Sequence, residues 1–363
     1  MDHLLIDGHN DLPWAHRERF GGDLVRGDVA LAQPSLHTDL RRLSAGGVKG
    51  QFWSVYVPST MPEPHAVVAT LEQIDFVRRL VDRYDGLALA TTAADVERAV
   101  ASGRLASLLG IEGGHAICGS LAVLRQMHHL GVRYLTLTHN DNTSWADSAT
   151  DEPAVGGLSD FGRAVVAEMN RLGMIVDLSH VADTTMHDAL ETTTAPVIFS
   201  HSNARALCDV PRNVPDDVLA LVPDNGGIVM ATFVPFFVAE AAARWLNETR
   251  EIARRRSEES ERRVDVFEVI RQRARTEPVP PSTLDDVVRH VEYLREAVGI
   301  AHVGIGGDFD GSDFVTPGLE DVASDPRLFD ALRARRWSDS ELDGLAGRNI
   351  VRVMRDVEAV ACA

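Results

Sequence analysis

A histidine and an aspartate stand two residues apart near the start of the chain, in the segment Ile6-Asp7-Gly8-His9-Asn10-Asp11. The residues before His9 favour a short strand, and in an extended segment residues i and i+2 point to the same side. His9 and Asp11 therefore project together, with about 6–7 Å between their backbone positions. An imidazole beside a carboxylate suits borderline divalent metals such as zinc. The segment thus predicts part of a metal site.

Later apolar, strand-like runs also end in imidazole or carboxylate side chains. These residues are Glu112, His139, Asp177, His180, His201, Asp308 and Asp310. Any one of them could equally be a hydrogen-bonded strand-end residue or a helix cap. Together, at least five such groups would crowd one rim, where burial without a cation shifts their pKa values or destabilises the fold. The constellation therefore indicates a pair of divalent metal ions.

A two-metal hydrolytic centre needs a ligand that contacts both ions, either a carboxylated lysine or a carboxylate. Lys49 is the only lysine in the chain, and it precedes the apolar run of residues 50–57 instead of following it. A lysine bridge is therefore not expected. Glu112 is the natural bridging carboxylate.

Eight apolar, β-rich runs alternate with segments of helical periodicity. The expected strands are residues 4–7, 47–57, 105–111, 134–138, 174–178, 196–200, 227–233 and 302–306. The expected helices include residues 65–84, 93–102, 160–172 and 283–298. This alternation predicts an α/β fold, a (β/α)8 TIM barrel, with a doubly wound sheet as the alternative. In a barrel the carboxyl ends of all strands meet at one face, as the polar residues require.

We expect a single metallohydrolase domain over residues 1–363. An Arg- and Glu-rich segment with helical spacing predicts a helical insertion at about 239–282, before the last strand. Its charge run could mark a partner site, but we interpret it as a solvated helix. Ser338-x-x-Glu341 is a capping box that opens a C-terminal helical segment at about 338–360.

The charge and cysteine content limit the partners and the compartment. The 36 basic and 54 acidic residues give a net charge of −18, which argues against nucleic acid or an anionic membrane surface as a partner. Cys118, Cys208 and Cys362 are odd in number and widely spaced, which favours a reducing compartment. With the first expected strand beginning close to Met1 and no long apolar window, we expect a cytoplasmic protein. A homodimer is an assembly that the sequence leaves open.

Long motifs, in consistent order, resemble the membrane (renal) dipeptidase family of the amidohydrolase superfamily, in a cytoplasmic bacterial-type form. The motifs are DGHNDLPW (7–14), QFWSVYVP (51–58), GIEGGH (110–115), LTHNDNTSWADS (137–148), GLSDFGRAVVAEMNRLGMIVDLSHV (157–181), FSHSNARALCDVPRNVPDDVL (199–219) and HVGIGGDFDG (302–311). They span the whole expected barrel. The resemblance implies a zinc-dependent dipeptidase that acts through a hydroxide bridging two metals. Free dipeptides, including those with a C-terminal D-residue, are the implied substrates.

The resemblance also implies a role for each matching residue. Two zinc ions per chain would be bound by His9, Asp11, Glu112, His180 and His201. His139 would bind the substrate and polarise the scissile carbonyl, while Arg212 would hold the substrate's carboxylate. Asp308 would take a proton from the attacking water and pass it to the leaving amine.

The same residues leave other functions open. An N-acyl-amino-acid deacylase or a lactam or lactone hydrolase would use the same two metals, and Arg212 would serve any substrate with a carboxylate. A metal-dependent phosphoesterase fits less well, because motifs place only one basic residue near the expected site. A non-catalytic binding protein on this scaffold is disfavoured, since all the expected ligands and Asp308 are present.

Overall fold

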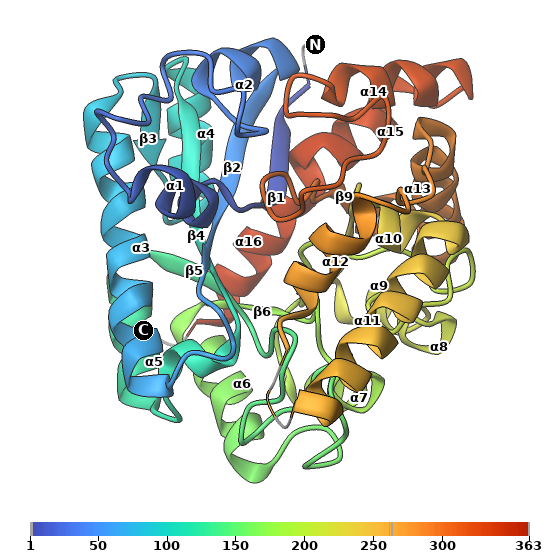
Figure 1. The fold of residues 1–363 in the computed structure, drawn as a ribbon. Coiled ribbons are helices and arrows are strands. Elements are labelled where there is room, and N and C mark those ends of the chain that lie inside the picture. The colour runs from blue at the N-terminus through green and yellow to red at the C-terminus, as the bar shows by residue number, and fades with distance from the viewer. Residues whose placement is uncertain (1–2, 261, 263, 362–363) are drawn as a thin grey trace.

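Eight parallel strands close into a barrel in the computed structural model, which describes residues 3–260, 262 and 264–361 (Figure 1). The barrel strands are β1 (Leu5–Asn10), β2 (Val48–Tyr56), β4 (Leu105–Glu112), β5 (Val132–Thr136), β6 (Ile175–Asp177), β7 (Ile198–Phe199), β8 (Ile228–Ala231) and β9 (Val303–Ile305). Neighbours in the sequence pair in turn, β1 pairs with β9, and the β2–β4 pairing closes the ring. The predicted (β/α)8 barrel is confirmed.

The apolar strands are buried on both faces, as parallel strands covered by helices must be. Alternate residues face the barrel interior and the helical layer. One buried cluster joins Ile6, Phe52 and Tyr134 to Ile350 and Met354 of the C-terminal helix. That helix, red in Figure 1, therefore packs with strand residues from the beginning of the chain.

A short additional strand, β3 (Leu87–Leu89), is absent from the expected strands. It pairs in parallel with residues 105–107 of β4, ahead of the point where β5 begins to pair at Leu109. A run of three residues, of which only Leu87 is buried, carries too weak a pattern to indicate a strand.

Helices surround the barrel and connect its strands. They are α1 (Leu12–Phe20), α2 (Leu40–Gly46), α3 (Glu63–Arg83), α4 (Ala93–Ala101), α5 (Leu121–His129), α6 (Asp160–Leu172), α7 (Asp183–Thr192), α8 (Asp216–Leu219), α9 (Val222–Asn225), α10 (Pro235–Val238), α11 (Glu240–Ser260), α12 (Val266–Ala274), α13 (Leu284–Val298), α14 (Asp325–Ala334), α15 (Asp339–Asp343) and α16 (Asn349–Val360), with short helical turns η1 (Gly114–Ile117), η2 (Ile300–His302) and η3 (Gly344–Arg348). None of the described helices is long and apolar enough to cross a membrane.

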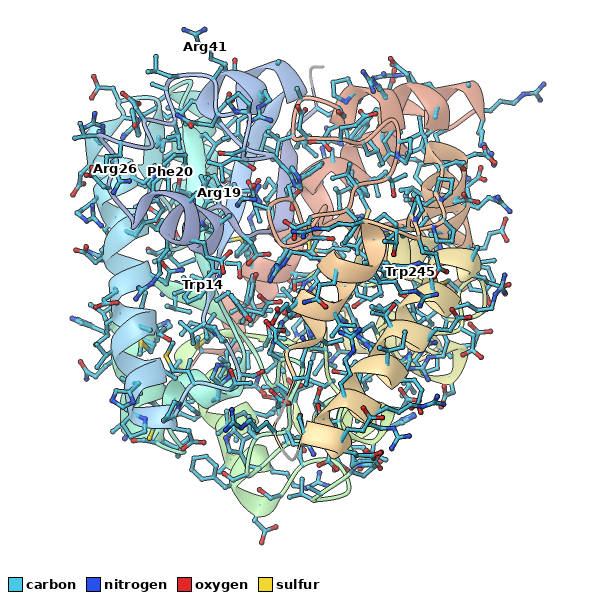
Figure 2. The ribbon with its side chains drawn as sticks, viewed as in Figure 1. Trp14, Arg19, Phe20, Arg26, Arg41 and Trp245 are labelled. Carbon is cyan, nitrogen blue, oxygen red and sulfur yellow. The ribbon has the colours of Figure 1, made fainter. Side chains whose placement is uncertain are left out.

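The helices α11 and α12 occupy the region of the expected insertion, between β8 and β9. They lie side by side on the right of Figure 1, and the Arg273 guanidinium of α12 stacks 4.6 Å from the Trp245 ring of α11. Trp245 marks the α11 side of the molecule in Figure 2, and Trp14 marks the α1 side. In the C-terminal segment, the capping box of Ser338 and Glu341 is present and opens α15.

Candidate metal centre and active site

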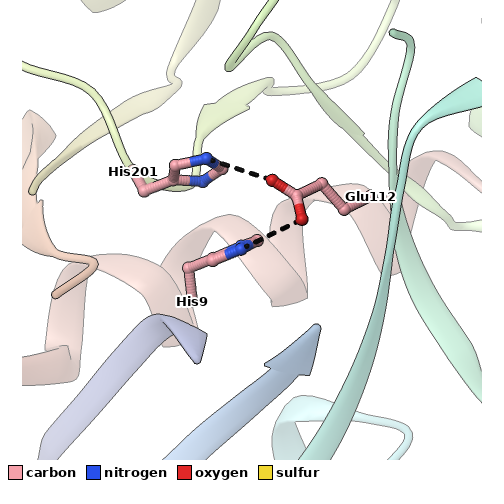
Figure 3. Close-up of side chains that lie close together, drawn as sticks. All are labelled: His9, Glu112 and His201. Atoms are coloured by element: carbon pink, nitrogen blue, oxygen red, sulfur yellow. Dashed lines mark ion pairs between the residues drawn. The ribbon is translucent and has the colours of Figure 1, made fainter. Parts of the chain in front are cut away.

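Strand ends bring the predicted metal ligands together around the carboxylate of Glu112, the last residue of β4. The Nε2 atoms of His180 and His201 lie 2.9 and 3.4 Å from Glu112 Oε1. The Nε2 atom of His9 lies 3.5 Å from the other oxygen, Oε2. Figure 3 shows Glu112 between His9 and His201, with one carboxylate oxygen turned to each. A carboxylate in this position can contact two ions.

The motif that contains His9 and Asp11 does not have the fully extended geometry that its spacing suggests. The strand β1 runs to Asn10, so His9 lies within it, and Asp11 leaves the extended conformation with φ −92° and ψ 19°. Asp11 Oδ2 nevertheless lies 3.3 Å from His9 Nε2. Asp308 joins these two residues, since one donor atom from each of the three lies within 4.8 Å of the others.

The predicted substrate-polarising residue, His139, lies next to the same carboxylate. Its Nε2 atom is 3.9 Å from Glu112 Oε1, and its ring centroid is 4.4 Å from that of His180. Burial lowers the pKa of His139 to about 4, so the imidazole is neutral at pH 7. A neutral imidazole keeps one N–H to donate.

Two of the site residues have backbone conformations that side chains rarely adopt. His180 has φ 70° and Asp308 has φ 61°, each just after a short strand. Such conformations cost about 1–3 kcal/mol and persist where the surroundings impose them. The backbone also packs closely at these strand ends, because a Cβ at Gly306 would lie 1.8 Å from the carbonyl oxygen of Ser200. The strand ends are thus packed as tightly as glycine permits.

A second set of polar residues orients the histidines. The Nδ1 atom of His9 lies 2.9 Å from the Tyr134 hydroxyl, and that of His201 lies 2.8 Å from Ser200 Oγ. Ser200 in turn donates to Asp177 Oδ2 at 2.7 Å. Each contact fixes the ring so that Nε2 points toward Glu112, as metal-binding histidines usually require.

No orienting role was predicted for these residues. Tyr134 begins an expected strand, Asp177 was expected only as a strand-end carboxylate, and Ser200 belongs to a motif in which other residues were given roles. Their function follows from strand register, because Tyr134 lies opposite Gly110, whose missing side chain leaves room for the ring. Glycine opposite an aromatic residue on adjacent expected strands is the only sequence signal that indicates this contact.

The donor set fits a divalent metal by its own chemistry. Within the described residues, the buried His9 Nε2 and Asp11 Oδ1 make no hydrogen bond. The Nε2 atoms of His180 and His201 face each other at 2.9 Å beside a shared carboxylate oxygen. Imidazole nitrogens and carboxylate oxygens converge here with too few protons to hydrogen-bond to one another. Such a group of atoms is a typical zinc donor set.

The charges around Glu112 keep it ionised. Burial opposes its ionisation, but the histidines, His9 first and then His180 and His201, hold its pKa well below the usual range. Asp308 behaves in the opposite way: burial, with the charges of Asp11 and Glu112, raises its pKa well above the usual range. Lys49 lies exposed on β2, so this lysine does not join the centre.

Arg212 comes from the loop between β7 and α8, close enough to Glu112 and Asp308 for their charges to act on it. It is 2% exposed, and none of its guanidinium nitrogens has a hydrogen-bond partner among the described residues. Its guanidinium packs 5.0 Å from the Phe237 ring. Burial lowers the pKa of Arg212 to about 10, which still leaves it charged at pH 7. A buried, unpaired guanidinium is suited to receiving an anionic ligand group.

Comparison with known proteins decides the family. The family model described as membrane dipeptidase (peptidase family M19) matches residues 1–363. The chain belongs to the M19 membrane dipeptidase family. Dipeptidase 3 of Mus musculus is 41% identical over 365 residues, which cover 99% of this chain and 65% of the mouse protein. The M19 chain thus spans just under two thirds of the length of this relative and of its counterpart in Rattus norvegicus, at 66%.

Solved structures share the fold of this chain. A metallo peptidase from Rhodobacter sphaeroides, crystallised with a phosphinate mimic of the dipeptide L-Ala-D-Ala, has a TM-score of 0.80 and 25% identity, covering 98% of this chain and 100% of that one. The probable dipeptidase PvdM from Pseudomonas aeruginosa has a TM-score of 0.85 over 99% of this chain and 96% of that one. At 22% identity, the PvdM comparison supports the fold alone.

Two aromatic residues complete the surroundings of the M19 site. The Tyr56 ring at the end of β2 lies 4.8 Å from the His139 ring, and Trp14 of α1 packs edge-on against Tyr56 at 5.5 Å. Tyr56 lies at the end of the second expected strand, where no charged residue indicated a functional role. Its aromatic run, Gln51-Phe-Trp-Ser-Val-Tyr56, was part of the resemblance but received no role.

Proposed function

We propose that this protein is a zinc-dependent dipeptidase that hydrolyses the peptide bond of free dipeptides. The observation that carries the proposal is the buried Arg212, whose guanidinium lacks a partner among the described residues and lies in the same site as the Glu112-centred donor set. Membership of the M19 family supports the reaction class. A buried guanidinium without an anionic partner explains a preference for substrates that end in a free carboxylate.

The metal ligands in this proposal are His9, Asp11, Glu112, His180 and His201, with Glu112 contacting both of two zinc ions. When bound, the ions supply Lewis acidity that activates water and polarises the scissile carbonyl. The second-layer contacts of His9 with Tyr134 and of His201 with Ser200 hold the donor nitrogens in place. The protein therefore offers a preorganised donor set.

The remaining side chains have roles that follow from their positions. Asp308 lies within reach of His9 and Asp11, where it can accept the proton of the attacking water and return it to the leaving amine. His139 faces the same centre and can donate its N–H to the oxygen of the carbonyl as negative charge develops there. Arg212 binds the substrate's terminal carboxylate and so holds the scissile bond next to the Glu112-centred donor set.

We also propose that a D-residue is accepted at the C-terminal position. Arg212 binds the carboxylate, a group that both configurations share. The Rhodobacter sphaeroides metallo peptidase, 25% identical, binds a mimic of L-Ala-D-Ala, which supports the same tolerance here. Parallel assays of L,L and L,D dipeptides test it, with hydrolysis of L,L substrates alone as the contrary result.

The decisive experiment compares wild type and Arg212→Met on a free dipeptide and on the corresponding dipeptide amide. We expect Arg212→Met to lower kcat/KM on the free acid by the equivalent of about 2–5 kcal/mol, because a buried charge pair is lost. The amide offers no carboxylate and should lose much less. Equal losses on both substrates would make Arg212 a structural residue and reduce the assignment to a generic metal-dependent amidohydrolase. An N-acetyl amino acid in the same assay separates a dipeptidase from a deacylase.

A cytoplasmic location is a further part of the proposal. Cys118 and Cys208 are free thiols, and burial raises the pKa of Cys208 to about 12, which keeps it unreactive. Cys362 lies outside the described residues. We expect thermal unfolding to be unchanged by a reductant, and a clear fall in melting temperature would contradict a reducing compartment. Homodimer formation stays a prediction.

A further inference from the structure

One arginine of the insertion differs from its neighbours on the same helix. On α11, Arg244, Arg254 and Arg255 form ion pairs with Glu240 or Glu251, at N–O distances of 2.7–3.3 Å. Arg250 is partly buried, and no described residue pairs with it. Burial without an acidic partner lowers its pKa. A partly buried cation with no carboxylate beside it is suited to receiving an anionic ligand group.

The periodicity of α11 sets the direction in which Arg250 points. Residues at spacings of three, four and seven share a helix face. Arg250 therefore shares a face with Ala243 and Leu246, which are both buried. Ala243 packs in a cluster with Cys208, Val210 and Phe237. Arg250 thus lies on the side of α11 that is turned toward the Arg212 loop.

Arg250 and Arg212 lie near one another in space. The Phe237 ring, which contacts the Arg212 guanidinium, is also part of the cluster beneath the α11 face. The two arginines are close enough for the charge of Arg250 to oppose that of Arg212. Asp308 and Glu112 partly offset the charge of Arg212, whereas no carboxylate in the described part of the chain does so for Arg250. Two guanidinium groups at one end of the site match a ligand with two negative charges.

Negative charge lies around Tyr56, whose ring lies 4.8 Å from that of His139. Asp265, which caps α12, and Glu18 of α1 are both close enough to Tyr56 for their charges to act on its hydroxyl. These carboxylates suit the ammonium group of a dipeptide, as the two arginines suit its carboxylates.

We propose that Arg250 forms a side-chain subsite that favours dipeptides whose C-terminal residue carries a carboxylate, as aspartyl and glutamyl residues do. In this arrangement Arg212 holds the main-chain carboxylate and Arg250 the side-chain carboxylate. The inference rests on the proposed dipeptidase function and adds the substrate class. It also assigns a role to the insertion, which supplies a specificity residue to a centre built by the barrel strands.

The test uses Ala-Asp and Ala-Asn, which differ in charge but hardly in size, each with an L- and a D-configured C-terminal residue. We expect the wild type to prefer Ala-Asp in kcat/KM by about tenfold or more, in keeping with one charge-assisted contact. Arg250→Met should remove that preference, mainly through a higher KM for Ala-Asp, and leave Ala-Asn within about twofold. Arg255→Met, on the exposed and ion-paired side of α11, is the matched control and should change neither substrate.

Arg250→Lys keeps the charge and should keep most of the preference, which guards against a misfolded methionine variant. Equal losses of activity on Ala-Asp and Ala-Asn in Arg250→Met, or no loss on either, would overturn the subsite while leaving the dipeptidase assignment intact. If the metal-loaded wild type cleaves neither dipeptide, the proposed function itself is wrong and the subsite falls with it. If the wild type prefers Ala-Asn, the charge assignment is refuted directly.

Discussion

Glu112 is the residue on which the whole centre converges. Imidazole nitrogens of His180 and His201 approach one of its oxygens, while His9 and the Ser54 hydroxyl approach the other. A hydroxyl at 3.2 Å from Oε2 helps to fix the plane of the carboxylate. Glu112 belongs to two groups of side chains that could hold a metal ion, one with His9 and His201 and one with His139 and His180. Among the proposed ligands, it is the only carboxylate that these two groups share.

Replacement of Glu112 tests the two-metal proposal at this scale. Glu112→Gln keeps the size of the side chain but removes its charge, and an amide is a poor bridge between cations. We expect wild-type protein prepared without chelator to contain two zinc ions per chain and Glu112→Gln to lose at least one. Elemental analysis measures this, with a variant of an exposed residue, Glu296→Gln, as control. One ion or none in the fully active wild type would contradict the proposal.

Residue types indicated the candidate ligands, but the partners of these ligands depended on strand register. His9, Glu112, His180 and His201 could be predicted because metal-binding side chains at the ends of apolar runs are informative from the amino-acid sequence alone. Tyr134 could not, since an aromatic residue in an apolar run is typical of a core, and its hydroxyl meets His9 only across the barrel interior. Asp308 was predicted at its position, while its left-handed backbone could not be inferred from an aspartate in a Gly-rich loop.

The loop between β5 and α6 shows how one element holds two site histidines. Asp147, fully buried, accepts hydrogen bonds from the backbone N–H groups of four consecutive residues, 154–157. The next residue, Ser148, donates to the carbonyl of His139 at 2.6 Å, and Ala149 N donates to the carbonyl of His180 at 2.8 Å. The loop thus braces the backbone at both positions.

Removal of the Asp147 carboxylate should loosen this brace. Burial opposes ionisation of Asp147, but the four N–H donors hold its pKa below the usual range. The group therefore stabilises the fold above its unfolded-state pKa, and that contribution is lost as the pH falls through the folded-state value. We expect Asp147→Ala to cost about 1.5–3 kcal/mol at pH 7, measured by denaturant unfolding. Asp151→Ala, exposed on the same loop, should cost far less.

Helices and strands could be predicted from the sequence where their hydrophobic pattern was long. The helices α6 and α13 lie within one or two residues of their expected ranges, because amphipathic periodicity over 13 and 15 residues leaves little ambiguity. The sixth barrel strand, β7, was expected over residues 196–200 but covers only Ile198–Phe199, because only these two residues pair with β8. The loop held by Asp147 could not be predicted, because its four donors are backbone groups that any sequence carries.

At the scale of the whole molecule, a net charge of −18 is accompanied by carboxyl groups deep inside the fold. Asp325, at the start of α14, is 1% exposed, and neither carboxyl oxygen has a hydrogen-bond partner among the described residues. Burial, with the charges of Asp7 and Asp321, raises its pKa well above the usual range. The folded state therefore binds a proton here more tightly than the unfolded chain does.

This difference makes stability depend on pH in a defined direction. The contribution of a protonated Asp325 is fully present below the unfolded-state pKa and is lost as the pH rises through the folded-state pKa. Asp325→Asn should remove that loss and raise the free energy of unfolding at pH 7 by about 1 kcal/mol or more. The advantage over wild type should shrink as the pH approaches 4. Denaturant unfolding from pH 4 to 8 measures it, with the exposed Asp82→Asn as control; a constant difference would contradict the assignment.

The pairing of β1 with β9 has a consequence for how the protein is made. Asp7 pairs with Ile305, so strands from opposite parts of the sequence must meet before the ring is complete. His9 and Asp11 are translated almost 300 residues before Asp308, which lies beside them in the folded chain. The candidate centre therefore cannot assemble from the N-terminal part of the barrel alone. It forms only when the segment that carries β9 has been made and has paired with β1.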